Sequence, residues 1–300
     1  MSFVLSLIAA VFYSVSSALL TRTLKGRRLA DDSGVPVPAN SAIQSGNALE
    51  ASVPVGNVAT ASALDDPNQI HRLTLLLATI ALVFHGWVVI HQTGLPNGLS
   101  LPLFTSLSAT TLTIVLLHIA LCMRQPADYL GLAVYPGAAL SLIVSHASGG
   151  GTPIVGAAIQ IHVLLSLVAY GVLSLAAAQA VLVSIQRHFL SIHKPGGFIR
   201  ALPPLDLTER LLFSLLTIGF VLLTLALASG FAFLDNMFDQ KLVHKTILSC
   251  IGWGIFGALL YGRWQFGWRG KRAVHWTLGG FCVLVLAYFG TKVVVEVLLG

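Results

Sequence analysis

The sequence predicts an all-α, polytopic transmembrane helix bundle, and three observations carry that prediction. Apolar residues make up 56% of the 300 residues, whereas only 9% are Asp, Glu, Lys or Arg. The mean hydropathy is +0.85. So few charges cannot form a water-soluble surface, so the lipid bilayer must cover most of the outside. The apolar residues also gather in runs of about 20, the length that crosses ~30 Å of hydrocarbon as a helix.

About eight such runs follow one another along the chain. They cover residues 2–21, 72–91, 100–122, 129–146, 161–186, 211–234, 246–262 and 275–296. The first run is followed, not preceded, by basic residues, which is typical of an uncleaved helix and not of a signal peptide. We therefore count it as a transmembrane helix.

The spacing of these runs divides the chain into four parts. Residues 1–29 form the first transmembrane helix, 71–147 hold spans two to four, and 148–300 hold spans five to eight. Residues 30–70 are rich in Ser, Ala, Asn, Pro and Gly and show no apolar period. This composition predicts a disordered insert between the first two spans.

Lys and Arg follow every second span and so predict the orientation of the bundle. They are Arg22, Lys25, Arg27 and Arg28; Arg124; Arg187, Lys194, Arg200 and Arg210; and Arg263, Arg269, Lys271 and Arg272. The intervening segments 91–100 and 147–160 carry no charge. By the positive-inside rule the basic loops and the insert face the cytoplasm, which places both termini on the outer side.

The same patterns exclude several classes of function. The net charge of +6 comes from loops at membrane boundaries, so it indicates topology and no nucleic-acid binding. Within the apolar runs, charged residues occur only near the ends, which argues against an ion-coupled transporter or proton pump. No GxSxG, HExxH or P-loop motif is present, so no soluble-type hydrolase or nucleotide site is predicted.

Histidine is the residue type that could carry chemistry here, since neutral imidazole is a common axial ligand of haem iron. The predicted topology places five of the ten histidines in one layer at the outer side. They are His85, His91, His146, His162 and His244. A haem site is one interpretation, and chance clustering is the other. We expect His118, deeper in span three, to be a hydrogen-bonded core residue.

Three C-terminal segments support the haem interpretation. They are QIHVLLSLVAYGVLSLAAAQ (160–179), VHKTILSCIGWGIFGALLYGRWQFGWRGKRAVHWTLGGF (243–281) and LAYFGTKVVVEVLL (286–299). They resemble the YpjD-like branch of the cytochrome c assembly superfamily, haem-handling membrane proteins that include CcsA, CcmC and CcmF. The resemblance implies that residues 148–300 form the assembly-like core of a multi-pass protein of the bacterial inner membrane. It also implies that haem is bound or relayed at the outer face and that His162 matches an external histidine ligand.

The residues then suggest a candidate haem site. The axial candidates are His162 with either His85 or His244, while Trp87 and Trp253 could pack on the macrocycle. For both tryptophans the alternative is helix packing or interface anchoring. We expect Gly252, Gly254 and Gly257 to permit close helix approach.

Two functions from different classes follow. The first is a haem-binding protein of cytochrome c assembly or haem handling, without turnover of its own. Its expected partners are lipid, haem and other cytochrome c maturation or transport subunits. The alternative is a structural or regulatory membrane subunit of a transport complex that has lost the haem site. The absence of Trp from residues 235–244, where the family has a tryptophan-rich loop, favours that alternative. A haem-ligating enzyme ranks third because nothing in the sequence would orient the reactants.

Overall fold

A computed structural model describes residues 1–32, 67–94, 99–147, 156–192, 202–233, 240–290 and 293 of the chain. Its eight long helices are α1 (Ser2–Asp32), α2 (Pro67–Thr93), α3 (Leu103–Cys122), α4 (Gly131–Val144), α5 (Ala157–Ser191), α6 (Leu205–Phe233), α7 (Gln240–Phe266) and α8 (Lys271–Val285). Three short segments complete the described elements: η2 (Asp128–Leu130), η3 (Ser145–Ala147) and η5 (Leu286–Gly290). No strand occurs in this part of the chain.

The helices confirm the predicted all-α membrane bundle. Eight stretches in the described residues are long and apolar enough to cross a membrane, and each coincides with a predicted span. A helix satisfies every backbone hydrogen bond within itself, which is the condition for crossing lipid. The predicted insert lies mostly outside the described residues, which reach Asp32 on one side and resume at Pro67 on the other.

Several helices extend beyond the predicted apolar runs, and the fifth and sixth are examples. The fifth has 35 residues and ends at Ser191, and the sixth begins at Leu205, ahead of the predicted start at 211. The extensions are polar or charged, so a hydropathy pattern misses them. In α6 the added turn is stabilised by an ion pair between Asp206 and Arg210, four residues apart.

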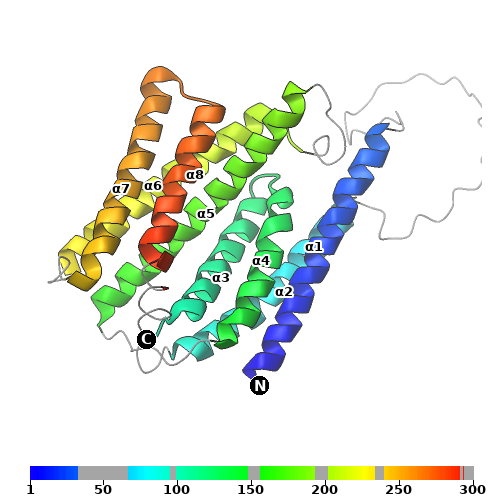
Figure 1. The fold of residues 1–300 in the computed structure, drawn as a ribbon. Helices are drawn as coiled ribbons and strands as arrows, with labels where there is room; N and C mark the ends of the chain where they lie inside the picture. Colours follow the sequence, from blue (N-terminus) through cyan, green and yellow to red (C-terminus); the bar gives the residue numbers. More distant parts are fainter. Residues whose placement is uncertain are drawn as a thin grey trace, which may run out of the picture.

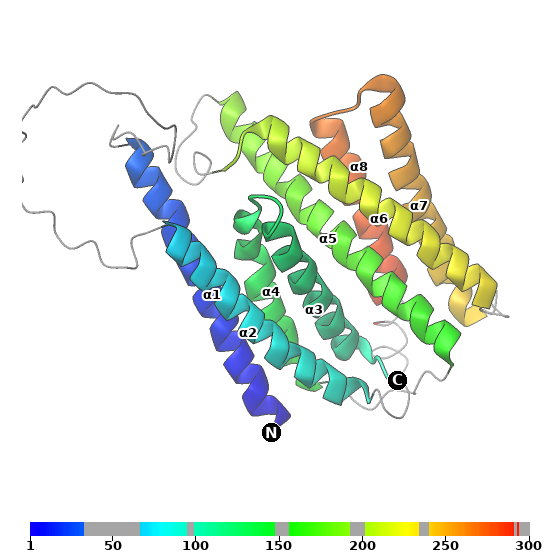
Figure 2. The ribbon, with the colours of Figure 1, turned by 180° about the vertical axis from the view of Figure 1, so that it is seen from behind.

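The bundle consists of two groups of four helices joined along one seam (Figures 1 and 2). Helix α1 packs on α2 and α4, and α3 packs on α2 and α4. In the second group α5 packs on α6 and α8, and α7 packs on both of these. The contact between α3 and α5 connects the groups. Figure 2 shows α5 lying between α3 and α6.

Close packing at the seam depends on Gly171 of α5. A Cβ atom at this position would lie 2.9 Å from Leu117 Cδ1 and 3.2 Å from Thr113 Cγ2, both on α3. The first distance is shorter than real Cβ contacts, so a larger residue would require the Leu117 side chain to shift. The seam therefore uses a small residue to let two membrane helices approach, as is common in lipid.

The glycine prediction for α7 is confirmed at Gly252 and wrong at Gly254, while a Cβ at Gly257 would make an ordinary contact. Gly252 packs against Leu284 of α8, where a Cβ would lie 2.7 Å from Cδ2. A Cβ at Gly257 would contact the Phe220 ring at 3.4 Å. Gly254 has no atom within 4 Å of that position, because it lies on the exposed side of the helix.

Large apolar side chains are exposed over the helices, as expected of a lipid-facing surface. Val83 is 66% exposed and Leu140 65% exposed. A water-soluble protein would not leave such residues uncovered on most of its helices. The core lies between the helices instead, with Tyr13, Tyr135 and Phe256 among the largest fully buried side chains.

The end of the bundle at which Arg124, Arg187, Arg210, Arg263 and Arg269 gather is called the basic end below. An ion-pair network ties α5, α6 and the α7–α8 connection together there. The buried Glu209 accepts from Arg187 at 3.1 Å and from Arg269 at 3.0 Å. Arg269 also pairs with Asp206 at 2.6 Å. These bonds, to Glu209 first and Asp206 second, raise the pKa of the Arg269 guanidinium above its ordinary value.

Candidate functional site

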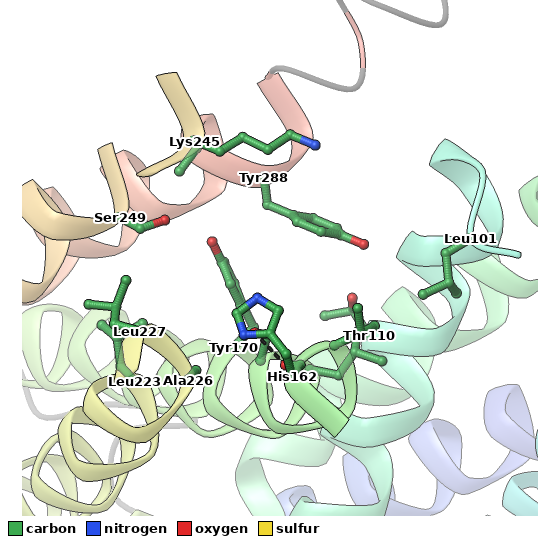
Figure 3. A pocket seen from close by; sticks show the side chains of 14 residues that line it. Leu101, Thr110, His162, Tyr170, Leu223, Ala226, Leu227, Lys245, Ser249 and Tyr288 are labelled. Atoms are coloured by element: carbon green, nitrogen blue, oxygen red, sulfur yellow. Dashed lines mark hydrogen bonds between the residues drawn. The ribbon is translucent and has the colours of Figure 1, made fainter. Parts of the chain in front are cut away.

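A cavity of about 310 Å³ lies on the seam, at the end of α5 opposite the basic end (Figure 3). We refer to it as the seam cavity. It is enclosed by the first turns of α3, α5 and α7, by the last turns of α6 and by η5. Its walls are mostly apolar. The polar side chains that line it are Thr110, His162, Ser166, Tyr170, Lys245, Ser249 and Tyr288. An apolar pocket with a few convergent polar groups is typical of a ligand site.

His162 belongs to a polar face of α5. His162, Ser166 and Tyr170 are spaced four residues apart, so they lie one above another on a single helix face. All three line the cavity. The imidazole is partly buried, and Nδ1 lies 3.0 Å from Oγ of Ser229 on α6. Figure 3 shows the ring pointing into the space between Tyr170, Tyr288 and Lys245.

The hydroxyl of Ser229 determines the tautomer of His162. It donates its single hydrogen to the backbone carbonyl of Ala226 at 2.8 Å. Its oxygen can therefore only accept from the imidazole, so Nδ1 carries the proton. In the neutral ring the lone pair then lies on Nε2, which faces the cavity. Fixing one ring nitrogen by a hydrogen bond so that the other can bind a metal is the usual arrangement at metal sites.

Two tyrosines, Tyr170 on the same face of α5 as His162 and Tyr288 in η5, also line the cavity. Tyr170 donates a hydrogen bond to the carbonyl of Leu284 at 3.1 Å, which fixes α5 against α8. Its ring lies 5.7 Å from that of Tyr288, centre to centre. Tyr288 belongs to η5, a five-residue π-helical segment. Such wide turns often occur at functional sites because they re-aim side chains.

Lys245 supplies the positive charge of the cavity. It lies in the first turns of α7 and extends across the cavity above Tyr288 (Figure 3). Among the described lining residues it is the only Lys or Arg, and none is Asp or Glu. The cavity therefore combines one imidazole nitrogen with one cation, which suits a ligand that carries both a metal and an acidic group.

The structure does not bring His85 to this cavity. His85 is fully buried in the first helix group, where Nε2 lies 2.9 Å from Ser108 Oγ and Nδ1 lies 3.3 Å from the Tyr13 hydroxyl. Both ring nitrogens thus have polar partners, and neither faces a cavity that His162 shares. The predicted axial pair of His162 with His85 is not assembled here.

The remaining candidates lie outside the lining as well. His244 directly precedes Lys245, but its side chain is exposed. Trp253 donates to Thr224 Oγ1 at 2.9 Å and stacks on a neighbouring phenyl ring of α6. Trp87 is 53% exposed and packs beside His91. Both tryptophans therefore take the packing and interface positions that the sequence left open as the alternative.

Deeper in span three, His118 agrees with its prediction as a core histidine. It is fully buried, and Nε2 lies 3.3 Å from the carbonyl of Ala127 and 3.4 Å from Cys122 Sγ.

Sequence reasoning missed the other polar residues of the site, which include Tyr170, Ser229, Lys245 and Tyr288. The four-residue spacing from His162 through Ser166 could have indicated Tyr170. Ser229 and Lys245 gave no signal, because only the packing of α6 and α7 on α5 brings them to the ring.

Comparison with known proteins identifies the family of this chain. The family described as cytochrome C assembly protein matches residues 70–299, which is most of the chain. The chain belongs to the cytochrome c assembly protein family. Its matched region begins in α2 and contains the whole cavity lining.

Several known proteins are similar to this chain in sequence. Inner membrane protein YpjD of Escherichia coli K12 is 31% identical over 239 residues, covering 76% of this chain and 88% of its own. Cytochrome c biogenesis protein CcsA of Prochlorococcus marinus MIT 9303 is 30% identical over 86 residues, 28% of this chain and 27% of its own. Protein HemX of Brevibacillus brevis is 24% identical over 131 residues, 43% of this chain and 48% of its own. No solved structure matches.

These findings establish the class of the protein. It is a multi-pass inner-membrane protein of the cytochrome c assembly family, as the similarity to YpjD and the eight membrane-spanning helices together show. Family membership supports a haem-related role in the membrane.

Proposed function

We propose that this protein binds haem at the seam cavity through Nε2 of His162 and acts in cytochrome c assembly or haem handling at the outer face of the inner membrane. The observation that carries the proposal is the tautomer fixed by Ser229, which leaves a lone pair on Nε2 directed into an apolar cavity. The names of the relatives CcsA and HemX, together with the family, support the same ligand.

The residues of the cavity fit one face of a haem. His162 provides one axial nitrogen, as in proteins that hold haem by a single histidine. The apolar walls suit the macrocycle, and Lys245 suits its carboxylates. The volume of about 310 Å³ is at the lower end of the range for small-molecule sites. A haem is larger than this volume, so the cavity would hold only part of it. When bound, its iron supplies a Lewis-acidic centre for the imidazole.

The choice of a second axial ligand stays a prediction. Among the described residues that line the cavity, His162 is the only histidine. His244 is one residue from Lys245 and is the closer candidate along the chain, whereas His85 would have to give up Tyr13 or Ser108. A protein that only binds and passes on haem needs no further catalytic group, which agrees with the expectation of no turnover.

The experiment is the absorption spectrum of the full chain, purified in detergent after expression with excess haem. We expect a Soret band and a reduced-minus-oxidised difference signal in the unaltered protein and their loss in His162→Ala. The matched control is His188→Ala, an exposed histidine at the basic end, which should retain the signal. His85→Ala and His244→Ala report on the second ligand.

Two outcomes would overturn the proposal. One is a colourless unaltered protein that also fails to bind added haem. The other is a His162→Ala variant that folds and retains the full signal. The first outcome would favour the structural or regulatory subunit, for which a stoichiometric partner recovered with the colourless protein is the positive finding.

A further inference from the structure

A second cavity lies on the same seam, at the basic end. Its volume is about 630 Å³. Its floor is α5, at Val172 and Leu175, and its two walls are the last turns of α3 and the first turns of α6. It is separate from the seam cavity that His162 lines, whose lining on α5 ends at Tyr170. We refer to it as the seam groove.

The seam groove is polar at one end and apolar at the other. Arg124 and Gln125, in the turn that follows α3, and Arg210 on α6 lie at the polar end. Further from the basic end both walls are aliphatic, with Leu117 on α3 and Ile218 on α6. From Arg124 to Leu117 is seven residues, or ~10 Å along a helix, which is about two thirds of one leaflet of a ~30 Å hydrocarbon core.

The charge at the polar end is positive. Arg124 is exposed and forms no ion pair with the described residues. Arg210 and Arg269 both pair with Asp206. The ion-pair network of the basic end contains three guanidinium groups and two carboxylates. Of the charged residues described, only Arg124 and Arg210 line the groove and no Asp or Glu does, so the lining itself is positively charged and suits a phospholipid headgroup.

We infer that the seam groove binds one anionic phospholipid from the leaflet at the basic end. Arg124 and Arg210 contact the phosphate, and an acyl chain lies along the aliphatic walls over Val172 and Leu175. The groove is open to the lipid side, since Ile218 is 53% exposed. The two arginines favour an anionic headgroup, and the aliphatic walls favour an acyl chain. The ligand must therefore carry both groups.

Such a lipid would fill the gap between α3 and α6, which both pack on α5. It would thus hold the two helix groups together at the basic end. The inference is independent of haem, because none of the residues that line the seam groove lines the seam cavity.

The test is binding of phosphatidylglycerol to the purified full chain, measured by native mass spectrometry and by thermal stability in detergent. Phosphatidylcholine with the same chains and inorganic phosphate are the comparison probes. We expect one tightly held phosphatidylglycerol and a larger stabilisation than with phosphatidylcholine or phosphate. In a variant with both Arg124→Gln and Arg210→Gln, affinity should fall about 30-fold, from ~1 kcal/mol for each basic residue.

Two further variants separate headgroup from chain. Ala120→Phe fills the groove while leaving both arginines in place, so it should also abolish the bound lipid. Its matched control is Ala133→Phe on the exposed side of α4, and Arg72→Gln is the control for loss of an exposed arginine. Equal binding of phosphatidylglycerol and phosphatidylcholine, an effect reproduced by phosphate alone, or equal losses in the control variants would overturn the inference.

Discussion

Nδ1 of His162 on α5 lies 3.0 Å from Oγ of Ser229 on α6, and this contact fixes which ring nitrogen faces the seam cavity. The two residues are 67 positions apart in sequence, so the arrangement depends on the packing of α5 along α6. It links a feature of the fold directly to the proposed metal ligand.

Replacing this serine tests the link. In Ser229→Ala the imidazole loses the partner that fixes its tautomer, and we expect haem affinity to fall about 10–100-fold, the usual cost of losing such a partner. Haem titration of the purified protein, followed by the Soret band, measures the change. Ser214→Ala, on the same helix near the basic end, is the control and should bind haem normally. Unchanged affinity in Ser229→Ala would show that the contact does not tune the ligand.

The hydrogen bond between Tyr170 and the Leu284 carbonyl should stabilise the second helix group. We expect Tyr170→Phe to lower the free energy of unfolding by about 1 kcal/mol, since the ring packing stays and only the hydroxyl is lost. Denaturant titration in mixed micelles is the measurement. Tyr261→Phe removes an exposed hydroxyl and should change stability little. Equal effects of the two substitutions would argue against the bond.

Glu209 should matter more for stability than its neighbour Asp206. Its side chain is 4% exposed and holds two arginines, so Glu209→Gln should destabilise by about 2–4 kcal/mol. Asp206 is 51% exposed, and Asp206→Asn should have an effect below about 1 kcal/mol. Thermal unfolding of both variants at low and high salt compares them. A larger effect at Asp206 would contradict this ranking.

The positive-inside pattern predicts that the basic end faces the cytoplasm. In a background without native cysteines, Ala157→Cys at the start of α5 should react with a membrane-impermeant thiol reagent on intact cells. Ser191→Cys at the other end of the same helix should react only after the membrane is opened. Both positions are exposed. The reverse pattern of labelling would invert the orientation and move the proposed haem site to the cytoplasmic side.

The number and order of the membrane helices could be predicted because lipid imposes one simple requirement, a long apolar run. The end of α5 and the start of α6 could not be, since the last turn of α5 and the first turn of α6 carry polar and charged residues and are held by contacts such as Arg187 with Glu209. Those contacts join residues on different helices and leave no periodic signal in either one.

The site was predictable only in part. His162 could be chosen from its position at the start of a span, and it lines the cavity. His85 satisfied the same criterion of depth, yet it faces Tyr13 inside the first helix group. Depth in a membrane is encoded by position along one helix, whereas the direction of a side chain depends on which neighbours the helix finds.

The wide turn at Leu286–Gly290 makes the cavity wall sensitive to chain length. A π turn accommodates one residue more than regular α-helical winding, and each residue of an α-helix advances by about 100°. Deleting a single residue between Val285 and Tyr288 would remove the extra residue that this turn accommodates, so the segment would rewind as an α-helix and the phenol would turn and shift relative to Tyr170. A shortening of one position, with no change in composition, would thus remodel the pocket as strongly as a bulky substitution.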